Sequence, residues 1–224
     1  MSEIIEIEIK SLLGDKEKSE ALKEKIIERQ GELVSKNRQL NHYFIVLDVE
    51  KFKVAIQPHI KEQDKKDYFE KILNEGKNFS VRTRDTDGEV LLVVKASIGD
   101  DSSSNGISRM EFETVMNMEL EELDQTLLEA GLELQAKWSR EREEYRLNET
   151  NICLDKNAGY GYLAEFERIV SDRASSDSIR QELIALMREF GVEELPQDRL
   201  ERMFAHYNEN WRNYYGTDKV FNIN

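Results

Sequence analysis

Charged residues recur at a spacing of two in several short stretches of the chain. The first stretch is EIEIK, in which Glu6, Glu8 and Lys10 alternate with isoleucines. A spacing of two places side chains on one face of a β-strand. Carboxylates bind hard divalent cations through oxygen, whereas guanidinium and ammonium groups bind phosphate oxygens. A strand face of this kind therefore suits the joint binding of a metal ion and a polyphosphate.

The same spacing returns in SVRTR, RMEFE, REREEY and AEFE, and further charges end VVK and ICLD. Charges gathered in a partly dry interior are costly unless they are paired or ligated. We therefore expect a bound ligand that carries both positive and negative charge. The residues concerned are Glu6, Glu8, Glu111, Glu113, Asp155, Glu165 and Glu167, together with Lys10, Arg82, Arg84, Lys95, Arg109, Arg140 and Arg142.

The elements that must position these residues follow from hydrophobic periodicity. Strands are expected at 4–10, 41–49, 78–84, 89–98 and 107–116, as two strands or one bent strand at 132–147, and as two strands within 151–170. Helices are expected at 15–40, broken or ended near Gly31, at 49–77 with Gly76 as C-cap, at 120–131, at 176–191 and at 195–216. Residues 99–106 are small and polar and indicate a loop.

The pattern predicts an α+β fold in which helices cover the apolar face of a mostly antiparallel sheet. The charged face must then point away from the helices. If the sheet curls, that face lines a cavity.

Composition narrows the classes of partner. The chain has 224 residues, a net charge of −14, 39% hydrophobic residues and one cysteine, Cys153. The negative charge argues against nucleic acid and anionic membranes as partners. No apolar run approaches about 20 residues, and the N-terminus lacks the apolar core of a signal peptide. We therefore expect a cytoplasmic protein that binds a small molecule, and the sequence leaves monomer and homodimer open.

The motifs EIEIK, QLNHYF, FSVRTR, VVK, RMEFE, REREEY, ICLD and GYGYLAEFE follow one another in an order that resembles the CYTH superfamily, the triphosphate tunnel metalloenzymes. The resemblance covers roughly residues 4–170. It implies an eight-stranded antiparallel β-barrel that forms a tunnel, with surrounding helices and a helical C-terminal tail. The implied organisation is one domain over 1–224, with the barrel at 1–171, a helical insert near 49–77 and C-terminal helices at 172–224.

The resemblance also implies residue roles. Divalent metal, Mg²⁺ or Mn²⁺, would be bound by Glu6, Glu8, Asp155, Glu165 and Glu167, and Glu111 and Glu113 would hold metal or order the basic residues. The triphosphate would be bound by Lys10, Arg82, Arg84, Lys95, Arg109, Arg140 and Arg142. The expected catalytic residues are Glu6, Glu8, Lys10 and Arg84. The chain departs from the family at Asn41 and His42, where an aspartate is common, and Lys137 is an alternative to Arg140 as the basic residue of that strand.

Three functions remain open at this point. The first is metal-dependent hydrolysis of tripolyphosphate, a nucleoside triphosphate or thiamine triphosphate. The second is class IV adenylyl cyclase activity, which makes cyclic AMP and pyrophosphate from ATP. Some bacterial cyclases of this class carry a His-Phe pair shortly before E-x-E-x-K, and the sequence starts too close to Glu6 for such a pair, which favours the hydrolase. The third is a module that binds a phosphorylated ligand without turnover.

Two of the motifs also have plain structural interpretations. REREEY fits an exposed charged strand. For Glu111 and Glu113, the structural interpretation is that their sole role is to form ion pairs with Arg82 or Arg84. His42 fits a partly buried, hydrogen-bonded histidine better than a general base.

Overall fold

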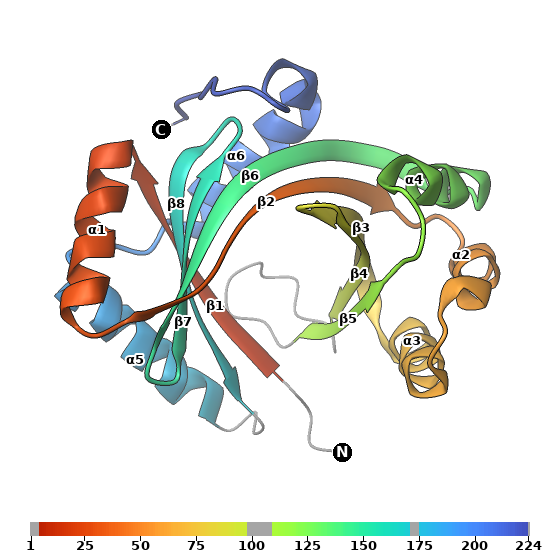
Figure 1. Ribbon diagram of the computed structural model, residues 1–224, viewed down its shortest axis with the longest axis horizontal. Coiled ribbons are helices and arrows are strands. Elements are labelled where there is room, and N and C mark those ends of the chain that lie inside the picture. Colours follow the sequence, from red (N-terminus) through yellow and green to blue (C-terminus); the bar gives the residue numbers. More distant parts are fainter. Residues whose placement is uncertain (1–4, 98–108, 171–174, 224) are drawn as a thin grey trace. The chain divides into compact units, whose positions relative to one another are not determined.

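The computed structural model describes residues 5–97, 109–170 and 175–223 (Figure 1). The described strands are β1 (Ile5–Gly14), β2 (Glu32–Ile45), β3 (Lys77–Thr86), β4 (Glu89–Ser97), β5 (Arg109–Val115), β6 (Glu133–Leu147), β7 (Thr150–Asn157) and β8 (Gly161–Val170). The described α-helices are α1 (Lys16–Glu28), α2 (Val49–Ile56), α3 (Gln63–Glu75), α4 (Leu120–Glu129), α5 (Ser176–Glu189) and α6 (Gln197–Asn210), with short 3₁₀ turns η1 (Gln57–His59) and η3 (Trp211–Asn213). The expected loop at 99–106 lies outside the described residues.

The strands form one sheet in the order β1-β8-β7-β6-β2-β3-β4-β5. The pairings of β1 with β8, β8 with β7, β7 with β6, β2 with β3, β3 with β4 and β4 with β5 are all antiparallel. The predicted α+β fold, with eight antiparallel strands, helices within 49–77 and C-terminal helices, is confirmed. The strand order begins at β1 and ends at β5, so among the described residues the sheet does not close into the expected barrel.

The chain divides into two compact units. Among the described residues, unit 1 comprises 5–38, 139–170 and 175–223, and unit 2 comprises 39–97 and 109–138. Strands β2 and β6 each contribute residues to both units. Among the described residues, no helix has the length and apolar character needed to span a membrane.

The core of unit 1 lies between its strands and helices α1 and α5 (Figure 1). The buried strand residues are Ile7 and Ile9 of β1, Ile152 and Leu154 of β7, and Ala164 and Phe166 of β8. Leu22 and Ile26 of α1 and Leu183 and Met187 of α5 pack against them. Because these strand residues alternate with charged ones, the helices cover one face of the strands and leave the charged residues on the other.

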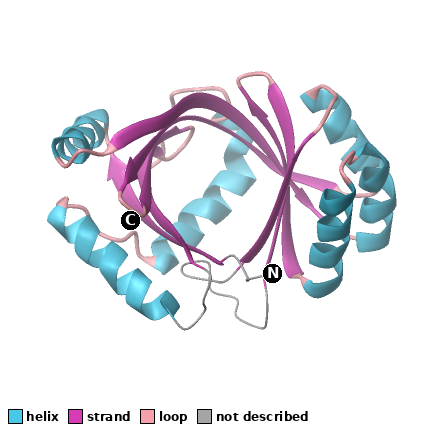
Figure 2. Cartoon of the chain, turned by 60° about the horizontal axis from the view of Figure 1, so that its bottom comes forward, coloured by secondary structure: helices cyan, strands magenta, loops and turns pink. Residues whose placement is uncertain are grey.

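The core of unit 2 repeats this division with helices α2, α3 and α4, and Figure 2 shows the helices beside the strands. Val81, Val94 and Phe112 come from β3, β4 and β5, and the helices supply Phe52, Ile56, Phe69, Ile72, Leu123 and Leu127. Phe69 contacts both Phe52 and Phe112, with ring centroids 5.5 and 5.1 Å apart. Arg82, Glu111 and their neighbours at a spacing of two are therefore on the opposite face from this core.

The boundary between the first helix and the second strand differs from the prediction. Helix α1 ends at Glu28, and residues 32–40 belong to β2 rather than to a helix. Gln30 adopts a φ of +65°, and the Gly31 amide donates to the Ile26 carbonyl at 2.9 Å, which closes the helix. The apolar residues Leu33 and Val34 are both exposed. The first part of β2 therefore lacks the alternation that identifies a strand, and pairing with its neighbour decides its conformation.

The turn between β7 and β8 forms backbone hydrogen bonds with the C-terminal segment. The Gly159 amide donates to the Lys219 carbonyl at 3.0 Å, and the Phe221 amide donates to the Gly159 carbonyl at 2.8 Å. Gly159 has a φ of +82°, and a Cβ at this position would lie 2.7 Å from the ring of Tyr207. Only glycine therefore combines this backbone conformation with the close approach of the ring.

On the helix-covered face of unit 1, Glu143 accepts hydrogen bonds from Lys23, Lys36 and Tyr145 at 2.7, 2.7 and 2.8 Å. Burial raises the pKa of Glu143, but the hydrogen bonds from Lys23, Lys36 and Tyr145 outweigh burial and hold it at about 2. A carboxylate with a depressed pKa stabilises the fold at pH values above its unfolded pKa. This contribution is lost as the pH falls from about 4.5 toward 2.

Replacing Glu143 by glutamine is therefore expected to lower the free energy of unfolding at pH 7 and to flatten its fall between pH 4.5 and 2. Urea denaturation across this pH range measures both effects. Glu141→Gln, at an exposed position of the same strand, is the matched control. Identical pH profiles for the Glu143→Gln variant and the unaltered chain would contradict the assignment.

Candidate active site

The charged residues of unit 1 converge through the register of its strands. Lys10 on β1 lies opposite Glu165 on β8, and Glu8 lies opposite Glu167. Arg142 on β6 lies opposite Asp155 on β7. Residues directly opposite in an antiparallel pair share a face and contact each other. The predicted acidic and basic residues of these four strands therefore form one surface.

Ion pairs connect the basic residues of this surface to Asp155 and Glu165. Arg142 donates to Asp155 from Nε at 2.7 Å and from Nη2 at 2.6 Å, and it also donates to Glu165. Arg140 Nη1 donates to Asp155 Oδ2 at 3.1 Å. Lys10 contacts Glu8, and its Nζ lies 3.5 Å from Glu165 Oε1. The Asp155 side chain is 0% exposed, so these basic side chains are its partners in place of solvent.

The local backbone holds Lys10 in this position. Its carbonyl accepts a hydrogen bond from the Leu195 amide at 2.7 Å, so the connection between α5 and α6 runs beside β1. Burial lowers the pKa of the Lys10 ammonium, but the charges of Glu165 and Glu8 raise it above its ordinary value overall. Burial raises the pKa of Glu165, but Lys10 and Arg142 hold it well below its ordinary value. Both groups are therefore charged at neutral pH.

Acidic residues outnumber basic ones around Glu167, on the same surface. The pKa of Glu167 is raised to about 7, chiefly by burial; the charges of Glu6, Glu165 and Glu8 act in the same direction, and a hydrogen bond from Asn151 opposes them. Asn151 Nδ2 donates to Glu167 Oε1 at 2.9 Å. Carboxylates that repel one another in this way are stabilised by a divalent cation.

Glu6, Glu8 and Glu167 offer oxygen donors only, which is the ligand chemistry that a hard metal ion prefers. Among the described residues, 5–97, 109–170 and 175–223, no group of three His, Cys, Asp or Glu side chains is placed so that it could hold a metal ion. The fit thus rests on the chemistry of the donors and on the raised pKa of Glu167.

Cys153 and Asn151 were not predicted to belong to this surface. Cys153 lies opposite Glu165 on β8 and opposite Glu144 on β6, and Asn151 lies opposite Glu167. Cys153 is buried, and burial raises the pKa of its thiol, so the sulfur is neutral. Asn151 and Cys153 precede Asp155 at a spacing of two, and this spacing could have placed them on the same face. The apolar residues Ile152 and Leu154 between them made the stretch resemble a buried strand instead.

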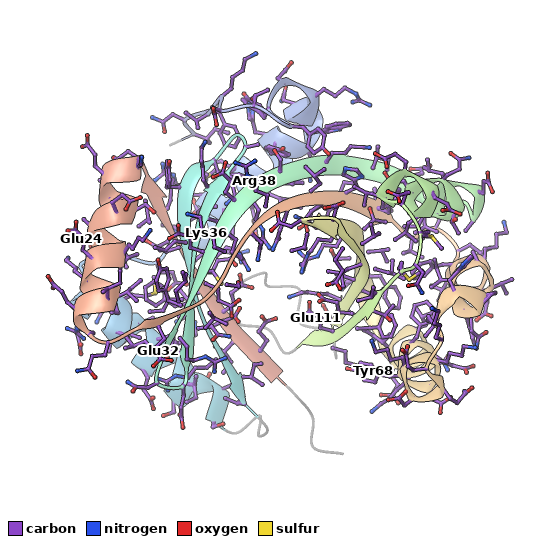
Figure 3. All side chains as sticks on the ribbon, viewed as in Figure 1. Glu24, Glu32, Lys36, Arg38, Tyr68 and Glu111 are labelled. Atoms are coloured by element: carbon purple, nitrogen blue, oxygen red, sulfur yellow. The ribbon has the colours of Figure 1, made fainter. Side chains whose placement is uncertain are left out.

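Unit 2 presents a second charged surface on β3, β4 and β5. Lys95 lies opposite Glu111, and Lys95 Nζ is 2.9 Å from Glu111 Oε2. Arg82 Nη2 is 3.8 Å from Glu111 Oε1, and Arg84 Nη1 donates to Glu113 Oε2 at 3.2 Å. Figure 3 shows Glu111 on β5 on the opposite side of the strand from Tyr68 of α3. The predicted ion pairs of Glu111 and Glu113 with the two arginines are confirmed.

Two polar residues of β2, which sequence reasoning did not assign to the site, hold these arginines. Arg84 Nε donates to Asn41 Oδ1 at 3.0 Å, and Arg82 Nη1 donates to the Tyr43 hydroxyl at 3.0 Å. The guanidinium carbon of Arg82 also lies 5.8 Å from the centroid of the Tyr43 ring. Burial lowers the pKa of Arg82, but Tyr43 and Glu111 raise it overall. The alternation of QLNHYF was the available signal.

Two further predictions have clear outcomes in the described residues. Arg140 and Arg142 have side chains only 14% exposed, so the interpretation of REREEY as an exposed charged strand is wrong for both arginines. Lys137 Nζ lies 3.4 Å from Asp124 Oδ2, so its ion pair is with a carboxylate of α4. His42 is buried and hydrogen-bonded, as expected. Arg109 begins β5, but its side chain lies outside the described part of the chain.

Comparisons with known proteins agree with this arrangement. The model of the CYTH domain family matches residues 4–199, which include residues of both units. No curated protein matches the chain.

Several solved structures are similar to it. The PH1819 protein from Pyrococcus horikoshii OT3 has 20% identity and a TM-score of 0.61, with coverage of 90% of this chain and 98% of that one. A candidate adenylate cyclase from Vibrio parahaemolyticus has 16% identity and a TM-score of 0.60, with coverage of 90% and 98%. HpAC1 from Hippeastrum, a protein with a dominant triphosphatase activity, has 15% identity and a TM-score of 0.55, with coverage of 90% and 96%. Likenesses at such low identity show a shared fold.

Proposed function

The chain belongs to the CYTH domain family, and from this premise we propose that it is a divalent-metal-dependent triphosphatase. Its substrate is tripolyphosphate, a nucleoside triphosphate or thiamine triphosphate. The observation that carries the proposal is the pairing of two sets on the strands of unit 1. Glu8 contacts Lys10 and Glu165 contacts Arg142, and the charges of Glu6, Glu8 and Glu165 act on Glu167. A metal ion together with a polyphosphate requires both signs of charge.

The basic residues bind phosphate oxygens. Arg142 is held by Asp155 and Glu165, and Arg84 is held by Asn41 and Glu113. A guanidinium carries several N–H donors in a planar fork, so an arginine ordered by a carboxylate can still donate to phosphate. Fixed cations of this kind need no reorganisation when negative charge develops on the transferred group.

The acidic residues divide into two roles. Glu6, Glu8 and Glu167 hold the metal ion, Mg²⁺ or Mn²⁺. Asp155 and Glu165 order Arg140, Arg142 and Lys10, with which they form ion pairs. When bound, the divalent ion neutralises phosphate charge and makes a nearby water a better nucleophile.

The reaction is hydrolysis of the terminal phosphoanhydride. A water oxygen attacks the terminal phosphorus, the bond to the bridging oxygen breaks, and orthophosphate leaves with release of a proton. The side chains of Lys10 and Arg142 stabilise the charge that builds on the phosphoryl and leaving oxygens. The protein thus contributes position and charge rather than a covalent intermediate. HpAC1, which shares the fold, is a precedent for this activity.

A panel of assays tests the proposal. Purified chain is incubated with tripolyphosphate, ATP or thiamine triphosphate in the presence of Mg²⁺ or Mn²⁺, and released orthophosphate is measured. We expect turnover of at least one substrate, its loss on addition of a chelator, and its return when the metal is restored in excess. Orthophosphate release that persists in the chelator would contradict the metal requirement.

The same panel separates the competing functions. Cyclic AMP and pyrophosphate from ATP, without orthophosphate, would identify an adenylyl cyclase. Saturable binding of tripolyphosphate without any product would identify a non-catalytic binding module. Either result would replace the triphosphatase assignment.

A further inference from the structure

A buried polar network lies behind the strands that present Arg82 and Arg84. Asp124 of α4 is hydrogen-bonded to His42 Nδ1 of β2 at 2.7 Å and to Thr83 Oγ1 of β3 at 2.6 Å. His42 is 2% exposed, Thr83 is 0% exposed and Asp124 is 7% exposed. One carboxylate therefore joins a helix to two strands inside the core of unit 2.

The network contacts β2 and β3 at one pair of opposite residues. His42 and Thr83 are direct partners in the antiparallel register. The two flanking pairs are Asn41 with Arg84 and Tyr43 with Arg82. Because side chains alternate along a strand, the flanking pairs point to the face opposite Asp124. The carboxylate thus holds the centre of the segment whose other face carries both arginines.

The charge of Asp124 fixes the direction of its hydrogen bonds. Burial raises the pKa of Asp124, but the hydrogen bonds from His42 and Thr83 lower it overall. An ionised carboxylate only accepts hydrogen bonds, so His42 Nδ1 and Thr83 Oγ1 are the donors. Lys137 Nζ, 3.4 Å from Asp124 Oδ2, adds a positive charge.

This arrangement is costly as a means of stabilising the core. Leu123 and Leu127 of the same helix are 0% exposed and pack in the apolar core without such partners. Apolar residues of similar volume often stabilise a core as well as a buried charged network does. What such a network supplies in addition is a defined alignment, since a carboxylate satisfied by several donors tolerates little displacement of them.

We propose that Asp124 is a positioning residue of the triphosphate site. Through His42 and Thr83 it fixes β2 against β3, so that Asn41 and Tyr43 hold Arg84 and Arg82 in the orientation that binds phosphate. This inference rests on the proposed function and extends it to a residue that does not touch substrate.

The test compares Asp124→Asn with Leu127→Ala, which removes core packing one turn along the same helix. Tripolyphosphate binding in the presence of Mg²⁺ is measured by titration calorimetry, and KM is measured by orthophosphate release, both well below the melting temperature of each variant. We expect both substitutions to lower the melting temperature. Only Asp124→Asn is expected to raise Kd and KM, by roughly 10- to 100-fold, as misplaced contacts do.

A double-mutant cycle identifies the path of the effect. If Asp124 acts partly through Arg84, then Asp124→Asn raises the Kd of an Arg84→Ala variant by a smaller factor than it raises the Kd of the unaltered chain, because only the path through Arg82 remains. Thr83→Val, which removes a single donor, serves as the second probe and covers the case in which Asp124→Asn does not fold. It is expected to shift Kd in the same direction by a smaller factor.

Each outcome discriminates. A raised Kd that is confined to Asp124→Asn and Thr83→Val, and is not additive with Arg84→Ala, supports the inference. An unchanged Kd in the folded network variants, or an equal rise in Leu127→Ala, overturns it while leaving the triphosphatase intact. If the unaltered chain neither binds nor hydrolyses tripolyphosphate, ATP or thiamine triphosphate, the proposed function fails and the inference falls with it.

Discussion

Replacing Glu6 by glutamine is expected to lower kcat for triphosphate hydrolysis by roughly 100- to 1000-fold, the loss that follows when several kcal/mol of metal-dependent stabilisation are removed. The amide keeps the size of the side chain but removes the charge that a divalent ion requires. Glu6 is chosen for the test because its charge contributes to the raised pKa of Glu167, which places it among the acidic residues of this surface. Orthophosphate release as a function of Mg²⁺ concentration measures the effect.

The matched control is Glu24→Gln, the same chemical change at an exposed position of α1. It is expected to leave kcat and the metal dependence unchanged. The free energy of unfolding of Glu6→Gln is expected to stay close to that of the unaltered chain, because the Glu6 side chain is partly exposed. A normal kcat in Glu6→Gln at limiting Mg²⁺ would remove Glu6 from the metal site.

Replacing Arg142 by alanine is expected to lower both stability and activity. The substitution leaves Asp155, with a side chain 0% exposed, and Glu165, with a side chain 11% exposed, without their main guanidinium partner. Breaking a buried ion pair by removing one member costs about 3–5 kcal/mol of unfolding free energy. Loss of the same guanidinium is expected to raise KM strongly, because it removes the proposed contact with phosphate. Urea denaturation and steady-state kinetics measure the two effects separately.

Arg142→Lys distinguishes charge from geometry. Lysine keeps the positive charge but cannot reproduce the donation from Nε and Nη2 to Asp155. We expect it to recover part of the stability and little of the KM. A fully stable and fully active Arg142→Ala variant would show that Asp155 and Glu165 find other partners and that Arg142 is outside the site.

The two charged surfaces could be predicted because their signal is local. In EIEIK and RMEFE, an apolar residue separates each pair of charges, so the pattern states both the strand and the face that the helices cover. The pairing of Lys10 with Glu165 then follows once β1 is set against β8. The resemblance to a family supplied the order of these motifs, which periodicity alone does not contain.

What could not be predicted depends on contacts between distant parts of the sequence. Asn41 and Tyr43 gain their roles only when β2 pairs with β3, and Asp124 meets His42 across 82 residues of chain. In the helix LEELDQTLLEAG, Asp124 resembles any acidic residue of a surface helix. The strand at 32–40 was missed for the related reason that its polar residues carry no alternation, and its partner supplies the conformation instead.

The docking of the C-terminal segment on the β7–β8 turn has a practical consequence for genetic screens. Because Gly159 combines a positive φ with contact to Tyr207 and hydrogen bonds to the Lys219 and Phe221 backbone, every other amino acid is excluded there. A saturation library scored for lost phosphate release would therefore rank position 159 among the most intolerant, next to true ligands of the substrate. Measuring the amount of soluble, heat-resistant protein for each variant in the same library would separate this structural glycine from the residues that act on the substrate.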